Sequence, residues 1–107
     1  MLLLPCPHLE AVVKFTAERQ QHVAQRHPDL MPGHLAELRQ TLADPDSVRR
    51  SLVDPEPILL TRWFSQLRGG RFIVVVVKYD HSAERFWLLT AYLARSLAGG
   101  EIEWQRD

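Results

Sequence analysis

The chain contains one long uninterrupted apolar run, at positions 72–77, and four of its six residues are valines. Such a run, rich in β-branched residues and without polar alternation, is typical of a strand buried on both faces. Apolar stretches at 58–67 and 86–93 flank it. Gly69 and Gly70 accept the positive φ angles of a tight two-residue turn. The pattern therefore predicts three consecutive antiparallel strands, with a Gly-Gly hairpin between the first two.

A helix is predicted upstream of these strands, over Ala17–Arg26. Thr16 is a favourable N-cap for it, because its hydroxyl can accept a hydrogen bond from the first turn. Pro28 ends the helix, because it moves the preceding residue, His27, out of the helical region.

A second helix is predicted to begin at Pro32, a residue that suits the first helical position, and to stop at the Asp44-Pro45-Asp46 sequence. Its apolar stripe, at helical spacing, consists of Met31, Leu35, Leu38 and Leu42. Shorter strands are predicted at 11–15, 48–53 and 102–104. The first ten residues are expected to form either a short edge strand or a poorly ordered lead.

The order of these elements predicts an α+β fold in one domain, 1–107, with two N-terminal helices packed on a four- to five-stranded antiparallel sheet. A two-residue turn places Thr61 opposite Lys78, and a five-residue second loop places Lys78 opposite Phe86. One face then carries Thr61, Trp63, Ser65, Lys78, Thr90 and Tyr92. The helices are expected on the other face, which carries Leu60, Phe64, Ile73, Val75, Val77, Trp87, Leu89, Ala91 and Leu93, with Arg62 as its main exception.

Composition restricts the function more than it identifies it. Thirteen basic and thirteen acidic residues give no net charge, so any contact with a nucleic acid is expected to be local. The single cysteine, Cys6, is typical of a reduced, cytoplasmic protein. The apolar run at 1–5 is too short for a signal peptide or a membrane span.

The densest group of candidate acid-base and anion-binding residues is His22, Arg26 and His27. His22 and Arg26 are four residues apart and share a helix face, whereas His22 and His27 diverge by roughly 140°. That divergence argues against a two-histidine metal site, and we expect no metal or cofactor. Taken alone, His22 is also compatible with an ordinary amphipathic helix position, and His27 with a loop hydrogen bond.

Four residues of the predicted sheet are further candidates. Lys78 ends an apolar strand, where its charge must reach solvent or a partner. The hydroxyl of Thr90, between apolar neighbours, needs a hydrogen-bond partner. Trp63 and Tyr92 on the same face are able to stack on bases, although aromatic residues more often belong to a core. With Arg62, these two aromatic residues are the expected RNA contacts.

Four segments, taken in order, resemble a nuclease signature: positions 22–29 (HVAQRHPD), 42–46 (LADPD), 74–78 (VVVVK) and 89–92 (LTAY). Their order and spacing are similar to those of the phage-type members of the barnase, EndoU, colicin and RelE-like nuclease superfamily. The similarity spans roughly 14–104. It implies a small endoribonuclease, used as a toxin or phage-derived effector, with RNA as substrate and a cognate antitoxin or inhibitor protein as partner.

The resemblance also implies roles for individual residues. In metal-independent RNA cleavage the 2′-hydroxyl attacks the adjacent phosphorus while a base and an acid move protons. His22 would be the base or the acid and His27 its alternate or partner, Arg26 and Lys78 would bind phosphate, and Thr90 would position it. Because the register places Lys78 and Thr90 away from the helices, they meet His22 only if the first helix lies at a sheet edge or the strand bulges.

Two other functions remain open at this stage. A non-catalytic domain derived from a nuclease fold would use the mixed face to bind a protein or RNA. A small-molecule-binding domain would need an enclosed apolar pocket, which nothing in the sequence indicates.

Overall fold

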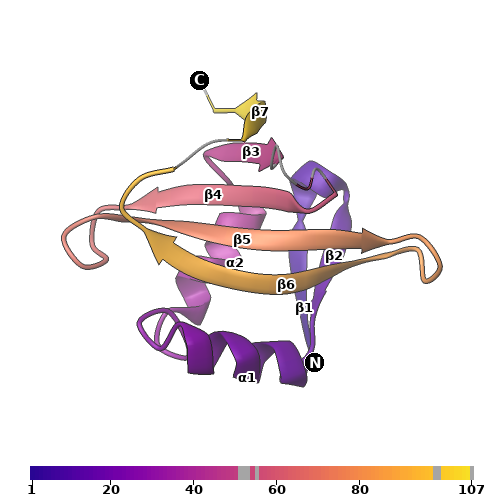
Figure 1. Ribbon diagram of the computed structural model, residues 1–107, viewed down its shortest axis with the longest axis horizontal. Helices are drawn as coiled ribbons and strands as arrows, with labels where there is room; N and C mark the ends of the chain where they lie inside the picture. Colours follow the sequence, from indigo (N-terminus) through magenta and orange to yellow (C-terminus); the bar gives the residue numbers. More distant parts are fainter. Residues whose placement is uncertain (51–53, 55, 98–99, 107) are drawn as a thin grey trace.

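The computed structural model describes residues 1–50, 54, 56–97 and 100–106, which form an α+β fold (Figure 1). Its helices are α1 (Ala17–Arg26) and α2 (Leu35–Ala43), and a short 3-10 helix, η1, covers Pro7–Leu9. Its strands are β1 (Leu2–Cys6), β2 (Ala11–Phe15), β3 (Ser47–Arg50), β4 (Ile58–Phe64), β5 (Arg71–Asp80), β6 (Arg85–Ala94) and β7 (Glu101–Gln105). No helix among these residues is long and apolar enough to cross a membrane.

The described strands form one sheet in the order β1-β2-β6-β5-β4-β3-β7. Neighbouring strands are antiparallel except β2 and β6, which are parallel, so the predicted four- to five-stranded antiparallel sheet is wrong. The difference arises at the N-terminus, where Leu4 and Cys6 are fully buried and pair with Val13 and Ala11. Because these apolar residues complete the core, the leading segment forms a strand, and the helices follow a β-hairpin instead of beginning the chain.

The helices agree with the sequence to different degrees. Helix α1 has the predicted bounds, and the hydroxyl of Thr16 accepts a hydrogen bond from the backbone N–H of Arg19 at 3.1 Å. Helix α2 begins at Leu35, three residues after the predicted start, because positions 28–34 form a series of turns. The end of α2 at Asp44 is as predicted. The predicted strand at 48–53 overlaps β3, and its last three positions lie outside the described residues.

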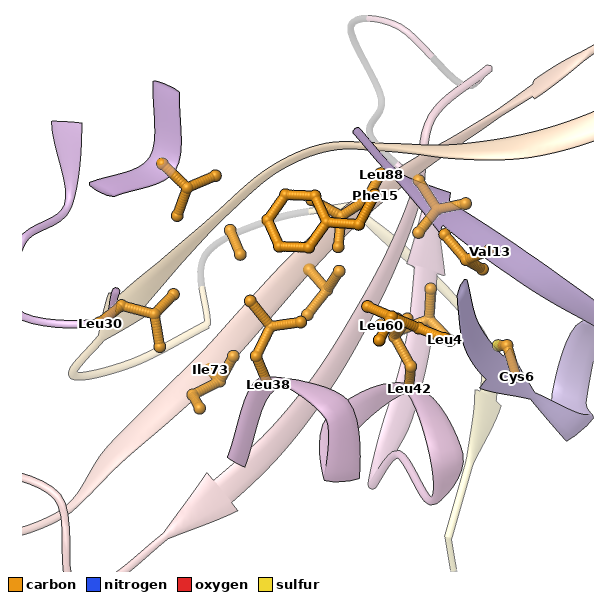
Figure 2. Packing of buried hydrophobic residues seen from close by; sticks show 14 of the residues in the cluster. Leu4, Cys6, Val13, Phe15, Leu30, Leu38, Leu42, Leu60, Ile73 and Leu88 are labelled. Carbon is orange, nitrogen blue, oxygen red and sulfur yellow. The ribbon is translucent and has the colours of Figure 1, made fainter. Parts of the chain in front are cut away.

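Helix α2 covers one face of the sheet, and the hydrophobic core lies between them (Figure 2). Its fully buried Leu38 and Leu42 point toward the strands, where Leu60 and Ile73 are also fully buried. Phe15 fills the centre of this layer. The β1-β2 hairpin runs across the ends of the other strands and closes the core at one side. Burial of this apolar surface is the main force that holds the layers together.

Helix α1 occupies a different position, along the edge of β6 (Figure 1). Strand β2 pairs with β6 only at Val13 with Phe86 and at Lys14 with Trp87, so no other described strand neighbours the remainder of that edge. The guanidinium of Arg19 donates from Nε to the carbonyl oxygen of Leu89 at 2.9 Å. A covering helix is one way in which proteins protect an open sheet edge. The prediction that both helices pack on the sheet face is therefore wrong for α1.

The hairpin between β4 and β5 is longer than predicted. It comprises positions 65–70, and Arg68, Gly69 and Gly70 all have positive φ angles. Trp63 consequently pairs with Phe72, so the predicted register is shifted. At Gly70 a Cβ atom would lie 2.5 Å from the Trp63 ring, so only glycine allows the indole to lie over the turn.

A bulge in β6 decides which side chains face the core. Val76 pairs with Thr90 and Val77 with Leu88, which leaves Leu89 without a partner on β5. Leu88 is therefore buried among the core residues, whereas Trp87 and Leu89, predicted for that side, line a hollow together with Lys78. We call the side of the sheet opposite α2 the open face. The predicted placement of Thr61, Trp63, Lys78, Thr90 and Tyr92 on that side agrees with the observed register.

Candidate functional site

The polar side of α1 carries a group of cations. Within α1 only Val23 is fully buried. Arg19, His22 and Arg26 recur at intervals of three and four residues, which places them on one face of the helix. His27 follows as the C-cap residue, and its backbone N–H donates to the carbonyl of Val23 at 2.7 Å. We refer to Arg19, His22, Arg26 and His27 as the basic cluster.

Burial, together with the neighbouring cations, lowers the pKa of His22. Burial is the largest cause that lowers the pKa of His22, and Arg19, Arg26 and His27 add repulsion toward its protonated form. Glu18 opposes them only as the smallest of the five influences. Because an unperturbed histidine already has a pKa of about 6.5, a lowered pKa leaves His22 as a neutral imidazole at pH 7.

The two arginines of the basic cluster are not neutralised by neighbouring carboxylates. Among the described residues, no Asp or Glu oxygen lies within ion-pair distance of Arg19 or Arg26. Cations that gather without acidic partners create a positive potential that attracts anions. The cluster therefore has the chemistry of an anion-binding surface.

The C-terminal end of α1 reaches the open face of the sheet. The rings of His27 and Tyr92 lie 5.9 Å apart between centroids, with their planes tilted by 39°. Thr90 precedes Tyr92 by two residues on the same face, and its Oγ1 atom is buried with no hydrogen-bond partner among the described residues. A buried hydroxyl without a partner is uncommon and is satisfied by a bound ligand or water. The structure thus brings His27 beside Tyr92, and Arg19 beside Leu89, on β6, while His22 and Arg26 lie on the same helix as Arg19.

Lys78 lies elsewhere. It pairs with Trp87 on β6, five residues before Tyr92, which corresponds to about 16 Å along a strand. Its Nζ atom is 3.4 Å from Oε2 of Glu56, and both residues line a hollow of about 470 Å³ with Trp87 and Leu89. Among the described residues, Lys78 forms its ion pair with Glu56, and no ion pair or hydrogen bond joins it to His22, Arg26 or His27.

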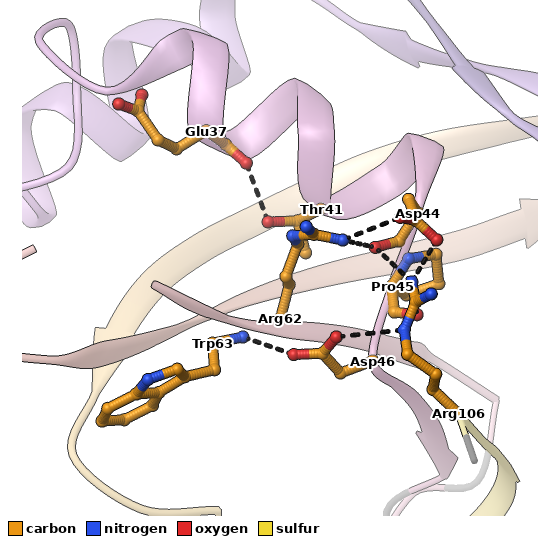
Figure 3. Close-up of polar contacts among 8 residues, drawn as sticks. All are labelled: Glu37, Thr41, Asp44, Pro45, Asp46, Arg62, Trp63 and Arg106. Carbon is orange, nitrogen blue, oxygen red and sulfur yellow. Dashed lines mark hydrogen bonds and ion pairs between the residues drawn. The ribbon is translucent and has the colours of Figure 1, made fainter. Parts of the chain in front are cut away.

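The expected RNA contacts Trp63 and Arg62 are separated by the sheet. Trp63 is 44% exposed, lies on the open face, and contacts the ring of Phe72 edge-on at 4.9 Å. Arg62 lies on the side that faces α2, and its Nη1 atom donates to Asp44 Oδ2 at 3.0 Å (Figure 3). Of the three expected contacts, Trp63 and Tyr92 share the open face, and Tyr92 also contacts His27 of the basic cluster. Arg62 lies on the opposite side of the sheet and is bound to Asp44.

Two kinds of catalytic centre find no support in the geometry. In the part of the chain that the structure describes, no three His, Cys, Asp or Glu residues are arranged to hold a metal ion. The thiol of Cys6 is buried, and burial raises its pKa, which disfavours the thiolate that a nucleophile requires.

Sequence reasoning missed two features of this site. Arg19 precedes His22 by three residues, so helical spacing alone would have added it to the cluster. The bulge at Leu89 has no comparable signal, because neither glycine nor a break in the apolar pattern marks it.

Comparisons with protein-family models, with curated proteins and with solved structures found no match to this chain. The nuclease resemblance therefore remains a prediction.

Proposed function

We propose that this chain is a metal-independent endoribonuclease whose centre is the basic cluster and the adjoining part of the open face. The observation that carries this proposal is the contact between His27 and Tyr92, because it joins the cations of α1 to the polar and aromatic surface of the sheet. Cations would hold the phosphate, and a sheet face with exposed aromatic rings would hold unstacked bases.

The proposed reaction needs a base, an acid and a cation. His22, kept neutral by its surroundings, takes the proton of the 2′-hydroxyl as that oxygen attacks the phosphorus. The bond from phosphorus to the 5′-oxygen breaks, and His27, acting as the acid, gives a proton to that oxygen. The products are a 2′,3′-cyclic phosphate and a free 5′-hydroxyl. Arg26 balances the charge that develops on the phosphoryl oxygens.

Thr90 and Lys78 take different places in this proposal. The buried Oγ1 of Thr90 is a donor that has no described partner, and a phosphoryl oxygen would satisfy it. Lys78 is left out of the reaction, because its ion pair with Glu56 belongs to a separate hollow.

We further propose that the protein acts in the cytoplasm, where its RNA substrate lies, and that an inhibitor protein restrains it in the producing cell.

The test is cleavage of single-stranded RNA by the purified protein in excess chelator. We expect His22→Gln to lower the cleavage rate by about a hundredfold or more while the circular dichroism spectrum stays unchanged. The matched control is His81→Gln, because His81 is an exposed histidine in the turn between β5 and β6, away from α1. Equal loss in both variants, or full activity in His22→Gln, would show that His22 is not the base. RNA binding without any cleavage would favour the non-catalytic alternative.

The pH profile tests the electrostatic part of the proposal. Because its surroundings lower the pKa of His22, the cleavage rate is expected to fall with acidification only below pH 6.5, the ordinary value for histidine. Arg19→Gln removes one of the repelling cations and should move that acidic limb to higher pH. A limb that keeps its position in Arg19→Gln would mean that a different group controls the rate.

A further inference from the structure

The two lysines of this chain flank one tryptophan. Of the thirteen basic residues, only Lys14 and Lys78 are lysines. Trp87 on β6 pairs with Lys14 on β2 and with Lys78 on β5, so the three residues form a row across three neighbouring strands. The Nζ atom of Lys14 lies over the indole of Trp87, 5.6 Å from the ring centroid. We call Lys14, Trp87 and Lys78 the lysine row.

The lysine row continues the line of cations on α1. Helix α1 follows β2 with one residue between them. Near the start of α1, Arg19 donates to the carbonyl oxygen of Leu89, and after its end His27 contacts the ring of Tyr92. Because Trp87 precedes Leu89 by two residues, the lysine row lies about 7 Å along β6 beyond the Arg19 end of the basic cluster.

The lysine row has the chemistry to hold one nucleotide of a single strand. Trp87 and Lys78 line the hollow of about 470 Å³, a volume within the range of about 300–1,000 Å³ that is usual for pockets that bind small ligands. An aromatic side chain stacks on any base, because every base has a π-face. An ammonium group binds phosphate as a point charge. A base on the indole would therefore have its phosphates within reach of ammonium groups.

The ammonium groups of the lysine row remain available to a phosphate. Among the described residues, no carboxylate oxygen lies within ion-pair distance of Lys14. Lys78 has Glu56 at 3.4 Å, but these side chains are 48% and 67% exposed, and such a pair is weak. An ammonium group has three donors, so one carboxylate does not occupy it. A second carboxylate in the hollow, Asp80, accepts a hydrogen bond from Ser82 Oγ at 2.7 Å.

We propose that the lysine row is a second subsite for single-stranded RNA, in which Trp87 stacks on a base and the two lysines bind the phosphates beside it. This inference rests on the proposed function, because it takes RNA as the ligand. Trp87 and Tyr92 are about 16 Å apart along β6, which corresponds to about five nucleotides at 3.4 Å for each stacked nucleotide. The substrate is therefore an unpaired strand that is long enough to reach both subsites.

The test measures binding of fluorescent uridine oligomers to the His22→Gln protein in chelator, by fluorescence anisotropy. We expect Trp87→Leu to weaken binding of a decamer by about tenfold, the effect of one stacked base, and to leave binding of a trimer unchanged. The matched control is Trp104→Leu, because Trp104 is exposed on β7, which β5, β4 and β3 separate from β6. Equal losses in both variants, or an unchanged decamer affinity in Trp87→Leu, would overturn the subsite.

Charge variants keep the inference testable if Trp87→Leu does not fold. Replacing Lys14 and Lys78 together by Gln removes two phosphate contacts. The slope of log affinity against log salt concentration for the decamer should therefore become shallower by about 1.4. Arg39→Gln on the exposed side of α2 is the control and should keep the slope closer to that of the parent protein. Glu56→Gln removes the carboxylate that competes for Lys78 and should tighten decamer binding.

The outcomes separate this subsite from the proposed reaction. A salt slope that the double lysine variant leaves unchanged, or a decamer affinity that does not rise in Glu56→Gln, would overturn the subsite. Cleavage that depends on His22 but not on the lysine row contradicts only the subsite. Decamer binding that depends on the lysine row without any cleavage contradicts only the nuclease.

Discussion

Two parts of this molecule are rich in arginine and differ in what surrounds the guanidinium groups. In the basic cluster, Arg19 and Arg26 lie beside two histidines, and no carboxylate among the described residues pairs with either arginine. On the far side of the sheet, Asp44, Asp46, Arg62 and Arg106 form a mixed group that we call the Asp44 network (Figure 3).

The Asp44 network joins three segments of the chain. Arg62 donates to the carbonyl of Asp44 at 2.6 Å and to its carboxylate at 3.0 Å, and Arg106 forms ion pairs with Asp44 and Asp46. Asp46 also accepts the backbone N–H of Trp63 at 2.7 Å. The hydrogen bond from Arg106 holds the pKa of Asp44 below its ordinary value, and the bond from Arg62 adds to this. The end of α2, β4 and the segment after β7 are fixed together by these contacts.

The difference separates charges that stabilise the fold from charges that, as we propose, bind a ligand. Opposite charges with shared hydrogen bonds lower the free energy of the folded chain. Like charges gathered on one helix raise the free energy of the folded chain. A cluster of cations without carboxylates is therefore expected where the protein gains function by binding an anion. The 42–46 segment of the nuclease resemblance accordingly has a structural role here, whereas 22–29 holds the proposed reactive groups.

The largest expected effect comes from reversing one charge in the basic cluster. Arg26→Glu places a carboxylate where the phosphate would bind, and we expect RNA affinity to fall by about tenfold or more. The urea midpoint should stay near that of the wild type, because Arg26 is exposed and has no described ion pair to lose. Arg39→Glu on the exposed side of α2 makes the same change in net charge and should retain affinity. Parallel losses in both variants would mean that overall charge, and not the cluster, governs binding.

For the Asp44 network we expect a loss of stability without a loss of RNA affinity. Arg62→Ala removes both bonds to Asp44 and the contact of the guanidinium with the Phe64 ring at 5.7 Å. We expect a loss of about 1–3 kcal/mol in the free energy of unfolding, measured by urea titration. Catalysis by the remaining folded protein should be unchanged. If Arg62→Ala instead weakened RNA binding at unchanged stability, the two regions would not be distinct, and the sequence-based role of Arg62 would be supported.

The smallest effect is expected from Asp44→Asn, and it depends on pH. A carboxyl group whose folded pKa is below its unfolded value, here 3.8, stabilises the fold above that value and loses this effect as the pH falls through the folded pKa. The wild type should therefore exceed Asp44→Asn in stability near pH 7. The difference should shrink as the pH falls below 3.8. A difference between the urea midpoints that stays constant from pH 7 to pH 3 would show that ionisation of Asp44 is not its source.

Local features of the fold were predictable from the sequence. The bounds of α1 follow from Thr16 as N-cap and from Pro28 after its end, and both signals act within a few residues. The apolar run at 72–77 also predicts the central strand, β5, because this signal too lies within a few consecutive residues. The grouping of His22 and Arg26 is also local, because helical spacing alone puts residues four apart on one face.

Non-local features were not predictable in the same way. The N-terminal strand, the six-residue hairpin and the bulge at Leu89 each depend on which segment lies next to which. A shift of one residue in register reverses the faces of a strand, and hydrophobic period alone does not fix that register. For this reason the sequence pattern predicts Trp87 and Leu89 on the core side, whereas the structure has Leu88 there.

The sequence by itself determined the helix that carries the basic cluster, the apolar strands and the residue types available for chemistry. Only the tertiary structure decided that α1 lies along β6 and not on the sheet face. The physical reason is that β2 leaves β6 after Trp87, so the next open backbone groups of β6 need a partner, and Arg19 supplies one to Leu89. That placement puts the polar helix beside the open face, where we propose that RNA binds.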